Sequence, residues 1–218
     1  MIAIFDWDGT LCDSVDGIVL AMRTAADELG IATPAEAAVR DIIGLGLSQA
    51  MERLFPAMEG AAREAMVGTY SRHYMELTSG PPRLFAGARE MLASLREAGW
   101  ELAVATGKSR RGLDRVLRGA AMEGVFVSTR CADETRSKPD PLMLCEILAE
   151  RGKTTGEAVM VGDSEYDLEM AARLGMAAIG VSYGVHSPGR LARHRPRAII
   201  DQLAELPPLL GSGAVSSG

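Results

Sequence analysis

Two carboxylates follow a short apolar run at the start of the chain. Residues 2–5 are apolar, and Asp6 and Asp8 come directly after them, before Gly9. In an open α/β sheet, ligands bind beyond the carboxyl ends of the strands, so we expect both side chains at such a site. Two anions so close repel each other unless a divalent cation or a basic side chain shares the site. The spacing therefore predicts a metal, although Asp-Gly is also ordinary turn chemistry.

A second apolar run leads to groups that can hold phosphate. Residues 101–105 are followed by Thr106, Gly107 and Lys108. A hydroxyl and exposed N–H groups at a strand end can bind phosphate oxygens. The alternative is that Thr106 is an ordinary helix-start residue. Lys108 also opens a basic cluster with two arginines, which can be either an anion site or a charged helix face.

Two later segments repeat this pattern. Lys138 precedes a proline that suits the first turn of a helix, where a lone lysine is usually a solvated charge. Residues 158–162 form a third apolar run, which ends before Asp163, Ser164 and Asp167. Ser164 and Asp167 also fit a helix capping pair, and Asp163 can still face the site. Their joint occurrence, in this order, favours one shared site.

Together the four segments resemble the motifs of the haloacid dehalogenase superfamily of hydrolases. The first motif, DxDGT, matches residues 6–10; Thr106 matches the second; Lys138 matches the third; and residues 162–167 match the fourth. The resemblance extends from Ile2 to about Leu209. It implies a Rossmann-like parallel-sheet core with an inserted helical cap that covers the active site.

The resemblance implies a role for each matched carboxylate. Asp6 would attack phosphorus and become an aspartyl-phosphate, and Asp8 would protonate the leaving group and then activate water. Mg²⁺ would be held by Asp6, by the backbone carbonyl of Asp8 and by Asp163, with Asp167 and Ser164 outside its direct ligands. Mg²⁺ prefers oxygen ligands, and one or two carboxylates plus phosphate are enough to hold it.

The phosphoryl group would be bound by Thr106 and Lys138. Gly107 and Lys108 are further candidates for phosphate binding, because they follow Thr106 directly. A carboxylate nucleophile cannot approach an anionic phosphate unless charge is neutralised, and Lys138 would supply part of that neutralisation.

Asp8 favours the phosphoester branch of the superfamily, since dehalogenases and phosphonate-cleaving members lack an aspartate there. Asp13-Ser14 and the Ile-Gly pair at 43–44 look most like phosphoglycolate phosphatases. The sequence therefore predicts a Mg²⁺-dependent phosphatase for a small phosphorylated metabolite. A phosphomutase or a pyrophosphatase on the same core is the alternative, and a non-catalytic binding module is a further one.

The chain changes character along its length. Helical patterns cover 16–29, 34–43, 47–54 and 61–77, and a Thr-Ser-Gly-Pro-Pro linker follows at 78–82. Strands are predicted at 2–6, 101–105, 125–128, 158–162, 177–181 and 198–200. Alternating strands and helices predict an α/β fold with a mainly parallel sheet. We expect a catalytic core of 1–14 and 81–210, a helical cap of 15–80 and a mobile tail of 211–218.

Within the predicted cap, the loop at 43–48 is expected over the substrate, because Gly44 and Gly46 permit close backbone approach. The alternative is an ordinary helix–helix connection. Arg53, Arg72 and His73 are further cap candidates, although such residues are mostly solvated on helices.

Composition limits the classes of partner. The 218 residues are 47% apolar with a net charge of −6, which argues against a nucleic-acid target. No stretch approaches the roughly 18 apolar residues of a membrane span, and the first residues do not look like a signal peptide. We expect a soluble cytoplasmic protein whose oligomeric state the sequence leaves open.

Overall fold

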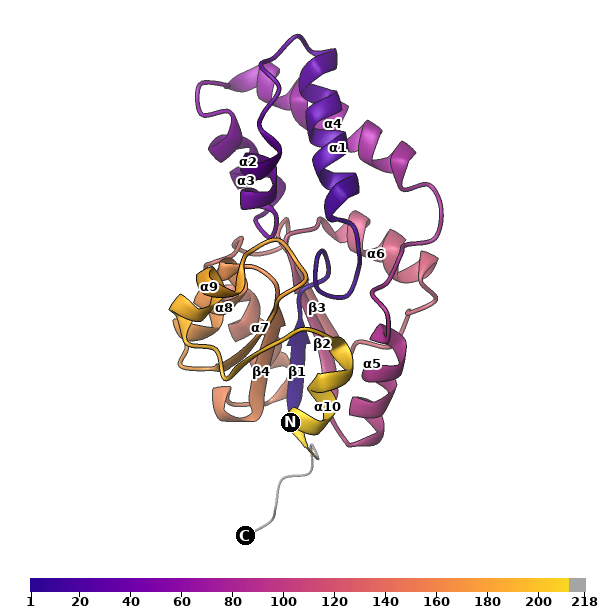
Figure 1. Ribbon diagram of the computed structural model, residues 1–218, viewed down its shortest axis with the longest axis vertical. Helices are drawn as coiled ribbons and strands as arrows, with labels where there is room; N and C mark the ends of the chain where they lie inside the picture. The colour runs from indigo at the N-terminus through magenta and orange to yellow at the C-terminus, as the bar shows by residue number, and fades with distance from the viewer. Residues whose placement is uncertain (212–218) are drawn as a thin grey trace.

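The computed structural model, which describes residues 1–211, has a six-stranded parallel sheet at its centre (Figure 1). The strands are β1 (Ile2–Phe5), β2 (Glu101–Thr106), β3 (Ser128–Cys131), β4 (Ala158–Gly162), β5 (Ala177–Val181) and β6 (Ala198–Ile200). Their spatial order is β3-β2-β1-β4-β5-β6, and every neighbouring pair is parallel. The winding direction reverses between β1 and β4, which is where sheets of this kind bind ligands.

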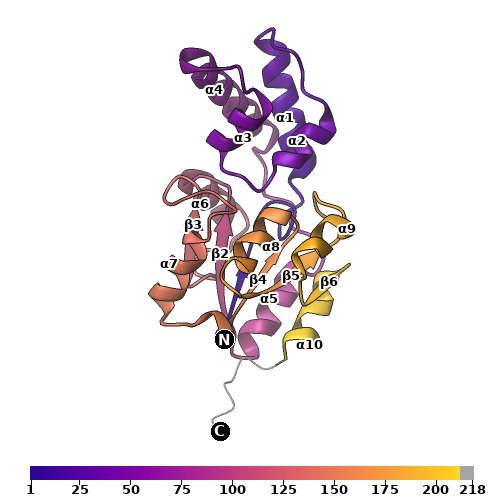
Figure 2. The ribbon, with the colours of Figure 1, turned by 90° about the vertical axis from the view of Figure 1, so that its left-hand side faces the viewer.

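Helices cover both faces of the sheet, because the strands carry apolar side chains on both faces. The helices outside the 15–77 region are α5 (Ala88–Glu97), α6 (Arg110–Gly119), α7 (Leu142–Arg151), α8 (Glu165–Ala172), α9 (Pro188–Leu191) and α10 (Leu206–Leu210). Ala3 and Phe5 of β1 pack with α5, α6 and α10, whereas Ile2 and Ile4 pack with α7, α8 and α9. The predicted α/β class with a Rossmann-like parallel sheet is thus confirmed (Figure 2).

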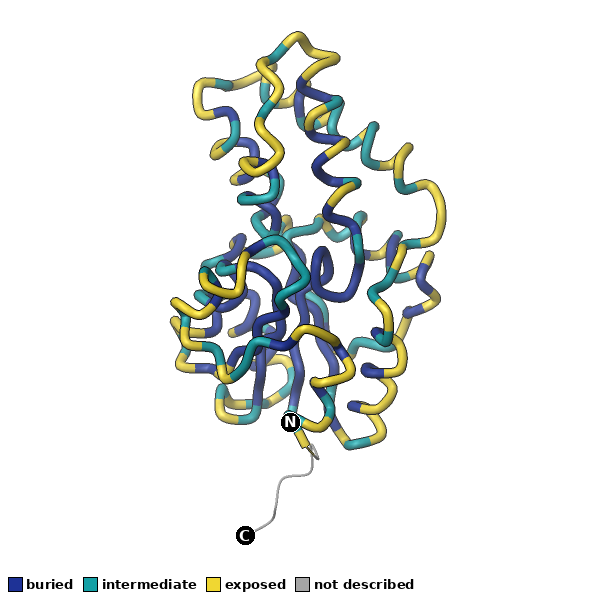
Figure 3. Tube along the Cα trace, viewed as in Figure 1, coloured by how far each residue is buried: buried dark blue, intermediate teal, exposed yellow. Residues whose placement is uncertain are grey.

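Four helices between β1 and α5 form a separate group, here called the helical unit. They are α1 (Val15–Glu28), α2 (Glu36–Ile42), α3 (Leu47–Leu54) and α4 (Gly60–Leu77). The unit has its own apolar cluster, to which Met22, Val39, Met51 and Met66 contribute fully buried side chains. It stands over the carboxyl ends of the strands (Figure 1), and buried residues alternate with exposed ones along its helices (Figure 3). This agrees with the predicted helical insertion into the core.

The helical unit is joined to the core by polar contacts. The hydroxyl of Tyr166 donates a hydrogen bond to the carbonyl of Asp41 at 2.6 Å, and the backbone N–H of Gly46 donates to Ser137 Oγ at 2.7 Å. Arg190 of the core pairs with the carboxylate of Asp41. These contacts hold the loop between α2 and α3 against the site end of the sheet.

The prediction of a strand at 125–128 is wrong by three residues, because β3 begins at Ser128. Val125 and Phe126 are apolar because they pack on the core beneath the sheet edge, not because they join its ladder. The strand itself carries Arg130, whose ion pairs with acidic residues of α7 make this edge polar. Apolar character marks burial, and burial need not coincide with strand pairing.

The helix after Lys138 also begins later than the sequence predicts. Pro139 lies outside it, and Pro141 precedes the first helical residue, Leu142. Asp140 first closes a turn, with its N–H donating to the Ser137 carbonyl at 3.1 Å. The turn leaves Lys138 outside the helix, as expected.

None of the helices described by the structure is long and apolar enough to cross a membrane. Of the predicted tail, residues 212–218 lie outside the described residues. The carbonyl of Gly211 accepts a hydrogen bond from Trp100 Nε1 at 2.9 Å.

The helical unit depends on a small core, so truncating it there should be costly. Met66 is the buried residue of α4, and Met66→Ala should lower the free energy of unfolding by about 2–5 kcal/mol. On the same helix, Gly68 is exposed with open space where a Cβ would lie, so Gly68→Ala should raise it by about 0.5–1 kcal/mol. Urea denaturation measures both, and equal effects would contradict this packing.

Candidate active site

Adjacent strand ends bring two of the predicted carboxylates together. Asp6 follows β1 and Asp163 follows β4, and the N–H of Asp6 donates to the carbonyl of Val161 at 2.9 Å. Both carboxylates are almost fully buried. Asp163 accepts hydrogen bonds from Thr10 Oγ1 at 2.8 Å and from the N–H of Val185 at 2.9 Å. Asp163 is therefore held in place from two sides.

Lys138 lies among three carboxylates. Its Nζ is 2.8 Å from Asp6 Oδ1 and 2.6 Å from Asp167 Oδ1, and its side chain is fully buried. Oxygen atoms of Asp6, Asp163 and Asp167 lie within 4.8 Å of one another. The one positive charge of Lys138 therefore lies among three carboxyl groups whose side chains are almost completely buried.

Burial, together with this imbalance of charge, shifts the pKa values of these side chains. Burial raises the pKa of Asp6 well above its ordinary value, although the charge of Lys138 opposes the shift. Burial, with the charge of Asp167, raises the pKa of Asp163 to about 7. Burial alone would lower the pKa of Lys138, but Asp167 and Asp6 outweigh it and hold that pKa above its usual value. Lys138 thus stays protonated in the folded protein. Its single positive charge is not enough to balance the carboxylates of Asp6, Asp163 and Asp167.

The donor set fits a divalent metal ion. Apart from the ammonium of Lys138, neither oxygen of Asp6 has a hydrogen-bond partner among residues 1–211. Clustered carboxylate oxygens are the ligands Mg²⁺ prefers. A dication beside Asp6 and Asp163 would supply the missing positive charge and a partner for the Asp6 oxygens.

Asp8 lies apart from this three-carboxylate group. Its Oδ1 accepts a hydrogen bond from Ser14 Oγ at 2.5 Å and lies 3.0 Å from Lys108 Nζ. Lys108 also donates to the hydroxyl of Tyr74, on α4, at 3.2 Å. Asp8 Oδ2 has no such partner among the described residues. The structure thus gives the two predicted aspartates of the first motif different surroundings.

Thr106 and Gly107 lie where β2 meets the helical unit. Thr106 is the last residue of β2, and its Oγ1 accepts the N–H of Lys108 at 3.2 Å. The helix start is instead Ser109, whose Oγ accepts an N–H of α6. A Cβ on Gly107 would lie 2.4 Å from the carbonyl oxygen of Leu45, so only glycine permits this approach of the cap loop.

The two glycines predicted in that loop have different positions. Gly44 adopts a φ of 105° and lines the cavity above Asp6 and Asp8. Gly46 does not line that cavity; a Cβ there would lie 2.9 Å from Ala132. Gly46 therefore helps to dock the loop against the core.

Ser164 and Asp167 form the predicted helix cap at the start of α8. Ser164 Oγ accepts the N–H of Asp167, and Asp167 Oδ2 accepts from the N–H and Oγ of Ser164. The other oxygen of Asp167 meets Lys138. Asp167 thus serves the helix and the buried charge group at once.

The structure assigns contacts that sequence reasoning missed. Thr10 belongs to the first motif and Ser14 follows it closely, but the sequence does not indicate which residue either of them contacts. Nothing in the sequence distinguishes Tyr74 from other residues of α4. The structure does not bring Arg53, Arg72 and His73 to the cavity: Arg53 pairs with Asp41, and the other two pair with Glu28.

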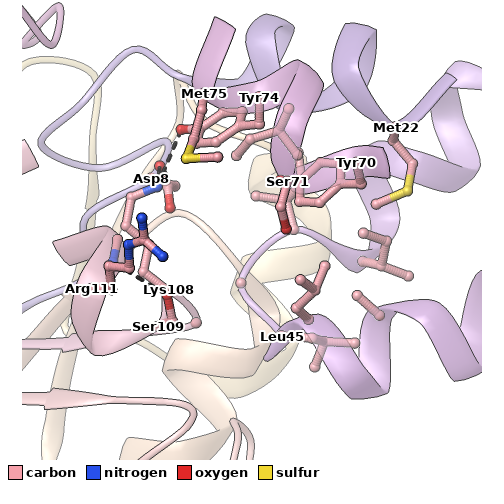
Figure 4. Close-up of a pocket in the computed structure, with 18 of the residues that line it drawn as sticks. Asp8, Met22, Leu45, Tyr70, Ser71, Tyr74, Met75, Lys108, Ser109 and Arg111 are labelled. Atoms are coloured by element: carbon pink, nitrogen blue, oxygen red, sulfur yellow. Dashed lines mark hydrogen bonds and ion pairs between the residues drawn. The ribbon is translucent and has the colours of Figure 1, made fainter. Parts of the chain in front are cut away.

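A cavity of about 290 Å³ opens above the strand ends. Its floor includes Asp6, Asp8, Gly107 and Lys108 from the core. Its upper part lies between α1, α3 and α4 (Figure 4). The helical unit therefore encloses whatever binds next to the two aspartates.

Comparisons with known proteins agree with this architecture. The family model described as haloacid dehalogenase-like hydrolase matches residues 3–181. "Probable phosphatase IndB" of Dickeya dadantii (strain 3937) is 35% identical over 209 residues, which are 94% of this chain and 91% of that protein. A phosphoglycolate phosphatase of Vibrio parahaemolyticus is 29% identical over 214 residues, which are 93% of this chain and 92% of that protein. The solved structure of a protein described as "Putative haloacid dehalogenase-like hydrolase" from Bacteroides fragilis has the same fold, with a TM-score of 0.87 and 24% sequence identity; the match covers 94% of this chain and 99% of that one.

The chain therefore belongs to the haloacid dehalogenase-like hydrolases, as the motifs predict. Its resemblance to phosphoglycolate phosphatases is confirmed at the level of overall similarity.

The raised pKa of Asp163 makes stability depend on pH and metal in a defined sense. Its folded pKa, about 7, exceeds the ordinary 3.8, so ionisation destabilises the folded state as pH rises through that interval. The metal-free protein should lose Tm as the pH rises from about 4 to about 7, and Mg²⁺ should raise Tm more at about pH 8 than at about pH 5. Melting curves with Mg²⁺ and with a chelator test this. Asp163→Asn should reduce the difference, although Asp6, whose pKa is also raised, still titrates. An equal Mg²⁺ effect at both pH values in the wild-type protein would contradict the prediction.

Proposed function

We propose that this protein is a Mg²⁺-dependent phosphatase that hydrolyses a small phosphate monoester through an aspartyl-phosphate on Asp6. The observation that carries the proposal is the surroundings of Asp6: a buried carboxylate at the floor of the cavity, paired with Lys138 and otherwise without a hydrogen-bond partner among residues 1–211. Membership of the hydrolase family and similarity to proteins named as phosphatases support it.

In the first step, an oxygen of Asp6 attacks phosphorus, and the bond from phosphorus to the ester oxygen breaks. The departing alkoxide takes a proton from the carboxyl of Asp8, which lines the same cavity. Asp8 Oδ2 is the available oxygen, since Oδ1 is engaged by Ser14 and Lys108. Splitting one displacement into two easier ones is the advantage of a covalent intermediate.

In the second step, a water molecule attacks the phosphorus of the aspartyl-phosphate. Asp8, now a carboxylate, takes a proton from that water, and the bond between phosphorus and the Asp6 oxygen breaks. Inorganic phosphate leaves, and both aspartates return to their starting states. Lys138 keeps its proton throughout and offsets the negative charge next to Asp6.

Mg²⁺, held by Asp6, the carbonyl of Asp8 and Asp163, would neutralise the charge of the phosphoryl group when bound. Asp167 would keep Lys138 and Ser164 in position, as it does in the structure. Thr106 and the N–H groups that follow it would bind phosphoryl oxygens beside Gly107 and Lys108.

The helical unit would act as a cap in this scheme. We assign residues 15–80 to it, and 1–14 and 81–210 to the catalytic core; the separate apolar cluster of the helices supports this division. Closure over the strand ends would exclude stray water from the phosphoenzyme. Similarity to phosphoglycolate phosphatases places 2-phosphoglycolate among the esters to be tested.

Asp6→Asn tests the nucleophile. An amide is a poor nucleophile, so Mg²⁺-dependent release of phosphate from p-nitrophenyl phosphate should fall to background. Asp16→Asn is the matched control, because Asp16 is exposed on α1 and should leave activity unchanged. Near-wild-type activity of Asp6→Asn would remove Asp6 from its role. Wild-type protein without turnover on any phosphoester would instead favour a binding module.

Asp8→Asn separates proton transfer from metal binding. The amide cannot exchange protons, so kcat should fall by about 100- to 10,000-fold. The backbone carbonyl is unchanged, so the rise in Tm that Mg²⁺ causes should persist. Loss of that Tm effect, or full activity, would contradict the separation.

A further inference from the structure

The upper part of the cavity is chemically unlike its floor. Figure 4 shows the cavity running from Asp8 at one end to Met22 at the other, with Tyr74 and Met75 on one wall and Leu45 opposite. Met22 comes from α1 and Leu45 from the loop before α3, so three segments of the helical unit enclose this part. Apart from a few hydroxyls and backbone groups, its lining is aliphatic and aromatic.

Two aromatic rings form part of this lining. Tyr70 and Tyr74, one turn apart on α4, stack with ring centroids 5.8 Å apart and an angle of 16° between their planes. The hydroxyl of Tyr74 is engaged by Lys108. Burial raises the pKa of both tyrosines, so neither ring carries a charge near neutral pH.

Most of the cationic side chains that border the cavity already have an ion-pair or hydrogen-bond partner. Lys108 is paired with Asp8, and Arg115 donates to the carbonyl and the hydroxyl of Thr78 at 3.0 and 2.9 Å. Arg111, on α6, forms no ion pair among the described residues. It is exposed, and it borders the cavity on the side of the floor, beside Lys108 and Ser109 (Figure 4). The upper part between α1 and α4 therefore offers no free positive charge from residues 1–211.

From this lining we infer that the substrate is a phosphate monoester whose alcohol portion is a largely apolar, ring-sized group. The inference rests on the proposed function and specifies its substrate class. The whole cavity, floor included, has a volume of about 290 Å³, which corresponds to roughly ten water molecules at about 30 Å³ each. With a phosphoryl group on the floor, the remaining space is still larger than a two-carbon acid fills. A carboxylate placed there would be desolvated against apolar walls without a partner. An apolar ring instead removes its own surface and that of the partly exposed lining residues Leu45, Tyr70 and Met75 from water.

Benzyl phosphate and ethyl phosphate test the inference, because both release a primary alcohol and differ mainly in apolar size. Burial of each methylene favours binding about fourfold, so kcat/KM for benzyl phosphate should be at least about tenfold higher. 2-Phosphoglycolate should be no better than ethyl phosphate. A benzyl-to-ethyl ratio near one, or a preference for 2-phosphoglycolate that Arg111→Gln abolishes, would overturn the inference.

Polar substitutions in the lining should lower the benzyl-to-ethyl ratio. Leu45→Asn and Met75→Gln keep side-chain size and introduce an amide that benzyl phosphate would leave unpaired. Met75 is 45% exposed, so its replacement should not endanger folding. Leu20→Asn is the matched control, since Leu20 is 53% exposed and does not line this cavity. The ratio should fall about tenfold in both lining variants and stay constant in the control; an equal ratio in all four proteins would overturn the assignment.

Binding separates this inference from the proposed function. Benzylphosphonate and ethylphosphonate have a carbon–phosphorus bond in place of the ester bond, so this reaction cannot cleave them. Calorimetry with Mg²⁺ therefore measures their affinities without turnover. If no ester is hydrolysed but benzylphosphonate binds at least about tenfold more tightly, the phosphatase proposal fails and the apolar pocket stands. If p-nitrophenyl phosphate is hydrolysed but the two phosphonates bind equally, the pocket assignment fails alone.

Discussion

The site is organised around a buried excess of negative charge. The ammonium of Lys138 pairs with Asp6 and Asp167, Asp163 lies in the same carboxylate group, and all four side chains are almost completely buried. Removing one partner from such a group leaves an uncompensated buried charge, which is strongly destabilising. The fold can therefore tolerate these charges only if it keeps four features together. They are the adjacent ends of β1 and β4, the turn before α7 and the N-terminal cap of α8.

A second lysine links the core to the helical unit. Lys108 pairs with Asp8 at 3.0 Å and donates to Tyr74 at 3.2 Å, so one ammonium contacts both the proposed proton donor and α4. Because burial strengthens electrostatic interactions, the position of α4 and the surroundings of Asp8 depend on each other. Movement of the helical unit would change the environment in which Asp8 exchanges protons.

The cavity combines two surfaces with different tasks. The core supplies its charged floor, where groups at strand ends are fixed by the sheet. The helical unit supplies its apolar upper part through Met22, Leu45 and the stacked rings of Tyr70 and Tyr74. The chemistry that all phosphate esters share can thus stay constant while the helices select the rest of the molecule.

The sequence by itself determined the strand-end positions of Asp6, Thr106 and Asp163, the class of fold and the family. Those features depend on local patterns: an apolar run predicts a buried strand, and the residue that follows it lies at the sheet edge. It placed β3 three residues too early, because apolar residues that pack under an edge resemble residues of a strand.

Only the tertiary structure decided which residues of the helical unit meet the core. Tyr74 is 34 residues from Lys108 along the chain, and Gly46 is 91 from Ser137. No local periodicity encodes which face of α4 turns toward the strand ends. That choice is made by packing, because the helices must bury their shared apolar cluster and still bring their polar groups to partners in the core.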